Sequence, residues 1–485
     1  MFNTTNNFLA EYIWVDSSGK YRSKTRVLSL DEYKNKDVSD YLNYPIWNYD
    51  GSSTGDAKKY EESNITECVI KPVAVYPNVF KNLNKDVLVY CQAYYLDNES
   101  FEGNIQEIEF EDYEFEKYVK ELKLHSINHN FSIAMKNFES EEYKEMKSMF
   151  GFEQEFFMID PETNMPFGMV KSPRKKSSCF FVNFIVGLIK HLFLSTNKYV
   201  GIEGEQGPYY CGVGENNAQC RSFLDNTMNK ARAMGLSITG FNYEVAPGQA
   251  EFQVCDYGIK ACHQLMMLRY LLVANGENYG IKISFDNSVI PGGEYNHSGC
   301  HTNFSTSKMR TGYTRASGEA TGLEYIKNII KTFDTSILNN RQEFEKVFGS
   351  GVTQRLEGNL ETSRWYQFDW GFGTRCTSIR IPISVVRNGY GYLEDRRPGA
   401  NVDPYTIADW LMEQVVDYET MPELEELSES EESSYDIPSN EDSSGEEVVF
   451  SPQTQNKEKR DTSTSDIINI NKTPKSKGFF SMFGY

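Results

Sequence analysis

The chain has 485 residues, enough for two or three domains with a substantial hydrophobic core. Its formal charge of −20 argues against a nucleic-acid-binding protein, which needs a basic surface. The nine cysteines include no C-x-x-C pair, which argues against a disulfide framework and a zinc ribbon. Such cysteines are typical of reduced thiols, so we expect a cytoplasmic protein.

No segment predicts export or membrane insertion. The N-terminus lacks a basic region followed by an apolar one, so no secretory signal is expected. The longest apolar run, residues 179–194, is short for a membrane span and is interrupted by Asn183, Lys190 and His191. We therefore expect an amphipathic helix there and no membrane partner.

The first hundred residues contain short runs of β-branched and aromatic residues separated by turn residues. The runs 11–16, 25–28 and 86–95 predict strands, and we expect a small mixed β domain over residues 1–105. Residues 96–147 are acidic and partly helical in pattern, and their place in the fold stays open.

From residue 150 onward, strand patterns alternate with helical ones and predict a larger α/β domain over residues 106–418, with an insertion near 170–205. Beyond it, residues 419–485 are Ser/Glu-rich and then Lys-rich, so we expect a disordered tail. The predicted strands of the larger domain are 152–159, 251–255, 281–285 and 377–383. Its predicted helices are 221–234, 257–279 and 322–332.

Two glutamates lie two positions apart in an aromatic-rich run that predicts a buried strand. Because residues two apart on a strand face the same way, Glu153 and Glu155 are expected side by side. Buried neighbouring carboxylates repel each other, so they stay ionised only beside positive charge, most simply Mg²⁺ or Mn²⁺. An exposed acidic edge strand is the alternative, and the pair alone does not decide between the two.

Further candidate ligands follow in later segments. Glu244 and Glu251 are seven residues apart with Pro-Gly between them, so a strand, a tight turn and a second strand would return both to one site. His301 lies in a Gly-Cys-His-Thr-Asn-Phe-Ser segment, and Glu394 precedes Asp-Arg-Arg-Pro.

These segments, in this order, resemble glutamine synthetase of the eukaryotic type (type II). The resemblance covers roughly residues 11–412 and includes residues 47–54, 206–214 and 378–382. It implies an α+β fold, with a β-grasp-like N-terminal domain and a catalytic α/β domain built on an antiparallel sheet. It also implies a homo-oligomer of stacked rings, a decamer, with active sites between subunits.

The resemblance further implies two metal sites for Mg²⁺ or Mn²⁺. Five carboxylates and one imidazole suit a hard divalent cation that clamps a transferring phosphoryl group. Taken alone, the histidine would be read as a core residue; in this set we expect a ligand. The implied ligands are Glu155, Glu244 and Glu251 for the tighter site and Glu153, His301 and Glu394 for the nucleotide-side site.

Four arginines match family positions that contact the glutamate carboxylate and the ATP phosphates. Phosphoryl transfer depends mainly on positioning and on neutralising negative charge, for which the guanidinium fork is suited. We assign Arg375 to catalysis, Arg355 and Arg396 to the substrate, and Arg380 to the nucleotide. Because Arg375 and Arg380 are an odd number of residues apart, a loop or bulge must separate them; a surface salt bridge is the alternative for any one arginine.

The resemblance supplies the remaining assignments. Asp50 matches an ammonium-binding aspartate donated by a neighbouring subunit, although an Asx-turn residue before Gly-Ser-Ser is the alternative. Glu361 matches a flap glutamate that shields the intermediate from water, and Asn296 matches a substrate-loop residue. The implied nucleotide contacts are Asn303, Ser305, Arg310 and Tyr392, the last either an adenine-stacking ring or a core tyrosine.

Several positions depart from the family pattern. His297 stands where the family has a glycine next to the substrate, so a bulky side chain could crowd that site. Ala250 replaces a tryptophan, and the neighbourhood of the flap differs at Glu357, Asn359 and Leu360. These changes leave the proposed metal ligands and the four arginines in place and fall on the substrate loop and flap.

We therefore predict an ATP-dependent, ADP-forming glutamate–ammonia ligase with Mg²⁺ or Mn²⁺ and ATP as co-substrate, acting through γ-glutamyl phosphate. A ligase that joins glutamate to a larger amine is the first alternative, motivated by His297. A non-catalytic structural or regulatory member is the second, and the intact metal and arginine sets argue against it.

Overall fold

The computed structural model describes residues 6–57, 66–95, 123–124, 126–171, 199–203, 206–290, 295–315 and 318–420. Of these, the residues up to Glu419 belong to one compact unit. The expected disordered tail, nearly all of the 170–205 insertion with its expected helix, and much of the acidic 96–147 segment lie outside the described residues. The predicted domain boundaries stay predictions.

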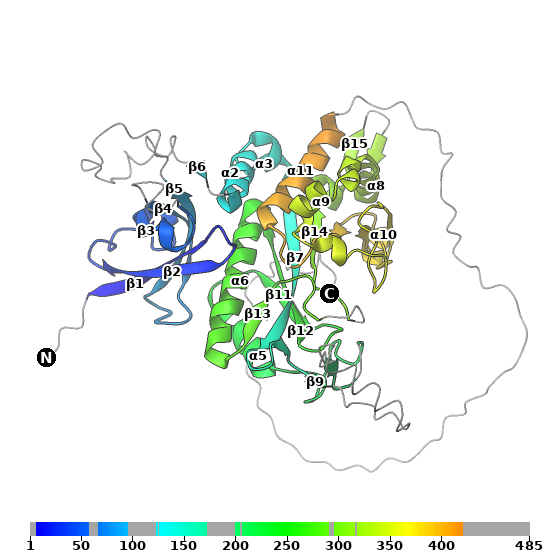
Figure 1. Ribbon diagram of the computed structural model, residues 1–485. Helices are drawn as coiled ribbons and strands as arrows, with labels where there is room; N and C mark the ends of the chain where they lie inside the picture. The colour runs from blue at the N-terminus through cyan, green and yellow to red at the C-terminus, as the bar shows by residue number, and fades with distance from the viewer. Residues whose placement is uncertain are drawn as a thin grey trace, which may run out of the picture. The chain divides into compact units, whose positions relative to one another are not determined.

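The N-terminal part forms a curled sheet of six strands in the order β2-β1-β5-β4-β3, with β6 also paired to β5 (Figure 1). Strands β1 and β5 are parallel, and the other neighbours are antiparallel. Aromatic residues such as Tyr12, Trp14 and Tyr49 fill its core. The strands are β1 (Asn7–Val15), β2 (Tyr21–Ser29), β3 (Trp47–Asp50), β4 (Glu67–Pro77), β5 (Val87–Tyr95) and β6 (Lys123–Leu124).

The larger part is built on a nine-stranded sheet in the order β11-β12-β7-β14-β19-β18-β17, with β8 and β13 also paired to β7. All its strand pairs are antiparallel except β17 with β18. Its strands are β7 (Met149–Asp160), β8 (Met165–Pro166), β11 (Ile238–Tyr243), β12 (Gln249–Tyr257), β13 (Lys282–Ser284), β14 (Cys300–Ser305), β17 (Trp370–Phe372), β18 (Ile379–Ile381) and β19 (Leu393–Asp395). The predicted α+β class, with the larger part built on a mainly antiparallel sheet, is confirmed.

Strand β7 is the centre of this sheet, and every residue in it except the last is buried. On one face, helix α6 (Gly258–Tyr279) packs against β7 and β12 and is itself largely buried. Arg269 of α6 donates to Gln154 Oε1 at 2.7 Å, so the residue between the two glutamates points away from them, toward the helix. The alternative of an exposed acidic edge strand is therefore excluded.

Short helices and hairpins surround the sheet. Helix α8 begins with a capping box in which Thr321 and Glu324 satisfy each other's backbone N–H groups. The remaining helices are α2 (Ser126–Phe138), α3 (Glu141–Met146), α5 (Arg221–Ala233), α7 (Ser307–Thr311), α8 (Gly322–Thr332), α9 (Arg341–Phe348), α10 (Ile383–Asn388) and α11 (Pro404–Thr420), with 3-10 turns η1 (Tyr41–Asn43), η2 (Gly51–Ser53), η5 (Ser336–Asn339) and η6 (Val352–Gln354). The remaining strands are β9 (Met169–Lys171), β10 (Tyr199–Gly201), β15 (Tyr313–Arg315) and β16 (Gly318–Ala320).

The predicted strands and helices coincide with described ones throughout the two sheets, with bounds that differ by a few residues. The strand predicted over 377–383 is shorter, Ile379–Ile381, because the chain turns into α10 directly after Pro382. Among the described residues, no helix has both the length and the apolar character that a membrane crossing requires.

Candidate active site

The register of the large sheet gathers the predicted ligands on one face. Glu155 on β7 lies opposite Glu251 on β12, and Glu153 lies opposite His301 on β14. Side chains opposite each other, and side chains two apart on one strand, share a face of the sheet. Four side chains from three adjacent strands therefore project to the same side, away from α6.

The same face continues across the next two strands. Asn303 on β14 is paired with Glu394 on β19, which in turn is paired with Arg380 on β18. Asn303 is two residues from His301, so it faces the same way. Polar and charged side chains thus form one continuous row across five strands of the sheet.

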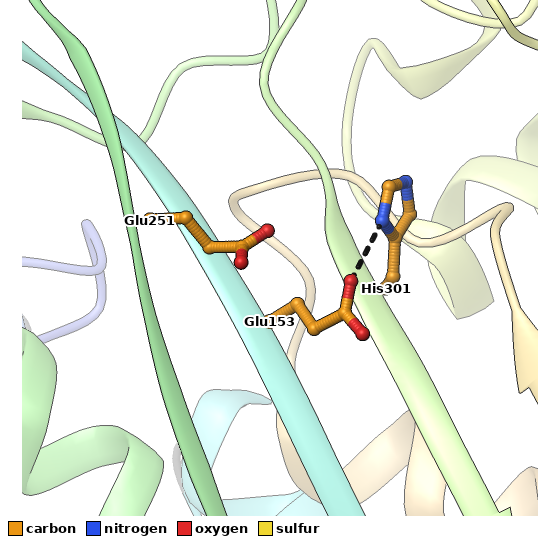
Figure 2. A group of neighbouring side chains, drawn as sticks. All are labelled: Glu153, Glu251 and His301. Carbon is orange, nitrogen blue, oxygen red and sulfur yellow. Dashed lines mark hydrogen bonds and ion pairs between the residues drawn. The ribbon is translucent and has the colours of Figure 1, made fainter. Parts of the chain in front are cut away.

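The tightest cluster in this row consists of Glu153, Glu251 and His301. One ligand atom from each lies within 4.8 Å of the others, and all three side chains are buried. Figure 2 shows the two carboxylates and the imidazole converging from three neighbouring strands, with His301 Nδ1 3.2 Å from Glu153 Oε2. This cluster combines one residue predicted for the tighter metal site with two predicted for the other.

Glu155 and Glu244 lie next to this cluster and are held by hydrogen bonds. Glu155 Oε2 accepts from Gly299 N and from Gln249 Nε2, each at 3.0 Å. Glu244 accepts from Asn242 Nδ2 at 2.9 Å and from its neighbouring backbone N–H at 3.2 Å. The expected strand–turn–strand is present as β11, a tight turn and β12.

The tight turn between β11 and β12 depends on a glycine. Gly248 has φ +68°, and a Cβ there would lie 2.7 Å from the backbone oxygen of Phe167. A larger residue would therefore be both strained and in collision. This close approach fixes the path of the turn that carries Glu244.

Burial shapes the protonation of the acidic residues. It raises the pKa of Glu155 to about 7 and that of Glu244 to about 8, with mutual repulsion contributing. Burial, followed by repulsion from neighbouring glutamates, also raises the pKa of Glu251 well above its ordinary value. Without a nearby cation these carboxylates therefore favour their protonated forms.

The donor set fits a hard divalent cation. Carboxylate oxygens and a neutral imidazole nitrogen are ligands that Mg²⁺ and Mn²⁺ accept. Burial and nearby arginines lower the pKa of His301 well below its ordinary value, so the imidazole is neutral, as a ligand must be. A bound divalent charge would also offset the repulsion among the buried carboxylates.

Glu394 is held by two arginines. Arg380 Nη1 and Arg396 Nη1 each donate to a different carboxylate oxygen at 2.6 Å, and the side chain of Glu394 is 1% exposed. His301 Nδ1 is 3.8 Å from Glu394 Oε1. Glu394 thus lies at the edge of the cluster, with its charge already balanced by guanidinium groups.

Arg355 contacts the cluster directly. Its Nη2 lies 2.9 Å from His301 Nε2, and its Nη1 donates to the backbone oxygen of Arg396 at 2.9 Å. Because a guanidinium only donates, His301 Nε2 must accept, so the imidazole proton sits on Nδ1 and faces Glu153. Cation binding through Nδ1 would require this proton to leave and Arg355 to release Nε2.

Arg375 and Glu361 lie at the rim of the site. Arg375 lies in the loop between β17 and β18, and such a loop is what its odd spacing from Arg380 requires. Its guanidinium lies 3.9 Å from Glu361 Oε2. Arg396 ties both loops down by donating to the backbone oxygens of Arg375 and Glu361 at 3.0 and 3.4 Å. Leu360 and Glu361 both have positive φ, 49° and 62°, so this loop is strained.

Asp50 lies elsewhere in the chain, at the end of β3, and is exposed. Its carboxylate accepts from Ser52 N at 3.1 Å and from Ser53 Oγ at 2.5 Å, which is the Asx-turn geometry of the alternative reading. Hydrogen bonds from Ser53 and Ser52 lower its pKa. Among the described residues of one chain, no hydrogen bond or ion pair connects Asp50 with the acidic cluster.

Of the residues predicted to contact the nucleotide, Asn303 and Ser305 lie on β14, Arg310 lies in α7, and Tyr392 directly precedes β19. Asn303 donates to Glu153 Oε1 at 2.8 Å, so it positions a proposed ligand. Arg310 donates to the backbone oxygen and hydroxyl of Ser305 at 3.1 and 3.0 Å. Tyr392 is 5% exposed, which favours the core reading over an open stacking surface.

Four residues near the site were not predicted. Gln249, Asn242 and Gln253 donate to Glu155, Glu244 and Glu251, the last at 2.6 Å. Tyr210 interacts with Arg375 and lies within electrostatic range of two of the glutamates. The spacings Asn242-x-Glu244 and Glu251-x-Gln253 could have indicated Asn242 and Gln253, because residues two apart on a strand share a face.

Asn296 lies in the loop before β14, where its backbone N–H donates to Gln206 Oε1 at 2.8 Å. Together with Arg355 it lines a cavity of about 340 Å³. Because Arg355 also contacts His301, this cavity adjoins the acidic cluster.

Comparisons with known proteins agree with this geometry. A family model described as "Glutamine synthetase, catalytic domain" matches residues 131–419. The chain is 33% identical over 416 residues to glutamine synthetase cytosolic isozyme 1-1 of Oryza sativa subsp. japonica, covering 85% of this chain and 95% of that protein. It is 35% identical over 409 residues to a glutamine synthetase of Neurospora crassa, covering 84% and 91%.

A solved structure has a similar fold. Glutamine synthetase of Plasmodium falciparum, determined by cryo-EM, matches with a TM-score of 0.54 at 13% identity. The match covers 85% of this chain and 72% of that one.

Proposed function

The chain belongs to the glutamine synthetase family, and we propose that it condenses L-glutamate with ammonia to L-glutamine while converting ATP to ADP and phosphate. The γ-phosphoryl group of ATP moves to the γ-carboxylate of glutamate. Ammonia then attacks the acyl phosphate, a C–N bond forms, and phosphate leaves.

The observation that carries this proposal is the continuous row of acids, histidine and arginines on one face of the catalytic sheet. Glu153, Glu251 and His301, with Glu155 and Glu244 beside them, would hold Mg²⁺ or Mn²⁺. A divalent cation there supplies charge neutralisation for a transferring phosphoryl group.

The arginines provide the positive side of the same site. Arg380 and Arg396 meet at Glu394, where phosphate or carboxylate oxygens can be bound by two guanidinium groups. Arg375 lies at the rim beside Glu361, on a loop that can close over the reacting groups and exclude water. These residues orient the substrates and stabilise the charge that develops during transfer.

Asp50 would act on the active site of a neighbouring subunit. Its hydrogen bonds keep it anionic at neutral pH, so it attracts ammonium and can accept the proton that is released. Its position on the exposed end of β3 suits a group offered to another chain. We propose a homo-oligomer of stacked rings, located in the cytoplasm, with glutamate, ammonium and ATP as small-molecule partners.

Isotope-resolved product analysis tests this proposal. Purified protein is incubated with L-glutamate, ATP, Mg²⁺ and ¹⁵N-ammonium, and then with a panel of larger amines. Glutamine labelled at its amide nitrogen supports the proposal. A γ-glutamylamide with no glutamine favours the larger-amine ligase, to which the presence of His297 in the substrate cavity points. Absence of glutamate-dependent ATP turnover in folded protein favours a non-catalytic member.

A further inference from the structure

The cavity beside the acidic cluster has the size of a small-molecule site. Its volume of about 340 Å³ is at the lower end of the range for ligand pockets, roughly 300–1,000 Å³. An amino acid is therefore a suitable occupant. The residues that line it include Asn296, His297, Arg355 and Glu357.

Arg355 provides positive charge in this cavity. Its side chain is buried, with the residue 5% exposed, and its Nη atoms contact His301 and a backbone oxygen. Its Nε has no hydrogen-bond partner among the described residues. A buried guanidinium with a spare donor is suited to a carboxylate.

His297 and Glu357 provide acceptors in the same cavity. His297 Nδ1 is buried without a hydrogen-bond partner among the described residues, and burial followed by the charge of Arg355 lowers the pKa of this imidazole. A neutral imidazole can accept a hydrogen bond. Glu357 is exposed, and within the described part of the chain no salt bridge or hydrogen bond engages its carboxylate.

A cation and two acceptors in one cavity match the two charges of an α-amino acid. We propose that His297 and Glu357 bind the α-ammonium group of the amino-acid substrate, while Arg355 binds the α-carboxylate of the same molecule. This inference rests on the proposed function, since it concerns the amino acid used there. It makes His297 and Glu357, two departures from the family pattern, specificity-determining residues of this chain.

Binding of matched ligands tests the assignment without relying on turnover. The full chain with Mg²⁺ and ADP is titrated calorimetrically with L-glutamate, with glutarate, which lacks the ammonium group, and with 4-aminobutanoate, which lacks the α-carboxylate. The variants are Glu357→Gln, His297→Phe and His297→Asn, because an asparagine amide can replace the imidazole nitrogen. Glu343→Gln on the exposed surface of α9 is the control for a lost charge.

We expect the wild-type protein to bind glutamate about tenfold more tightly than glutarate, the scale of one hydrogen bond to a charged group. This preference should fall toward parity in Glu357→Gln and His297→Phe, whereas glutarate affinity changes by less than about twofold. His297→Asn should retain part of the preference, and Glu343→Gln all of it. Preference for glutamate over 4-aminobutanoate should persist in the variants, because Arg355 is intact.

Equal weakening of glutamate and glutarate in the variants, or an unchanged preference, would overturn the assignment. Absence of glutamate binding to the wild-type protein would overturn it as well. If the protein binds glutamate with the expected preference over glutarate but forms no glutamine in the isotope experiment, the proposed reaction is refuted. The assignment of His297 and Glu357 to the α-ammonium group is then still supported. The two proposals therefore fail in different experiments.

Discussion

Replacing Glu155 with glutamine should stabilise the metal-free protein above neutral pH and weaken its stabilisation by divalent cations. Burial is the main cause that raises the pKa of this carboxylate from 4.5 to about 7, and arginine charge and the Gly299 N–H only partly oppose it. At about 1.4 kcal/mol per pH unit, that rise corresponds to about 3 kcal/mol. A neutral glutamine can still accept the hydrogen bond from Gly299.

The sign follows from proton linkage. A raised carboxylate pKa means that the folded protein binds the proton more tightly than the unfolded chain, so wild-type stability falls as pH rises from 4.5 to about 7. The Glu155→Gln variant does not lose this stability, because glutamine does not ionise. Because the neighbouring acids are coupled to Glu155, the measured gain above pH 7 should be on the order of 1–3 kcal/mol.

Urea unfolding in the presence of a chelator, at pH 5, 6, 7 and 8, measures this difference. We expect the Glu155→Gln protein to gain stability relative to wild type between pH 5 and 7 and to hold that gain at pH 8. Added Mn²⁺ should stabilise the wild type more than the variant, which keeps Glu153, Glu251 and His301 but lacks one neighbouring carboxylate. A pH-independent difference between the two proteins, or a variant stabilised by Mn²⁺ as strongly as the wild type, would contradict this role of Glu155. Glu343→Gln is the surface control.

Three further substitutions test other parts of the site. Arg396→Met leaves the buried Glu394 with one guanidinium in place of two, so the free energy of unfolding should fall by about 3 kcal/mol. Denaturant titration measures this loss. A loss below about 0.5 kcal/mol would contradict the proposed charge balance at Glu394. Gly248→Ala forces a Cβ against the backbone of Phe167, so the turn that carries the proposed ligand Glu244 must move. Mn²⁺ affinity measured by calorimetry should therefore drop at least about tenfold. Unchanged affinity would show that the turn tolerates an alanine at this position. Asp50→Asn should leave the melting temperature within about 2 °C but reduce glutamine formation at least about 100-fold. We also expect Glu155→Gln to be inactive, and mixed oligomers of the two variants should regain part of the activity. No recovery would argue against a site shared between subunits.

The sheet face that carries the candidate active site could be predicted only in part. The strand with Glu153 and Glu155 and the turn before Glu251 follow from local pattern, because alternation and Pro-Gly are properties of short segments. The loop between Arg375 and Arg380 followed from their odd spacing, and it is present.

The local sequence pattern does not predict which strands pair with each other. Nothing near residue 301 specifies that β14 lies beside β7, which precedes it by more than a hundred residues, and β19 has only three residues. The contacts that depend on this pairing could therefore be identified only in the folded structure. They are the contact of Arg355 with His301 and those of two arginines with Glu394. The tertiary packing that chooses strand neighbours decides these contacts.

The activity proposed for this chain is the joining of ammonia to glutamate. Its most direct test is the transfer of nitrogen from ¹⁵N-ammonium into product by the purified full-length protein with glutamate, ATP and Mg²⁺. We expect glutamine labelled at the amide nitrogen, with one ADP and one phosphate formed for each glutamine. ATP turnover without labelled glutamine, or a labelled product only with larger amines, would contradict it.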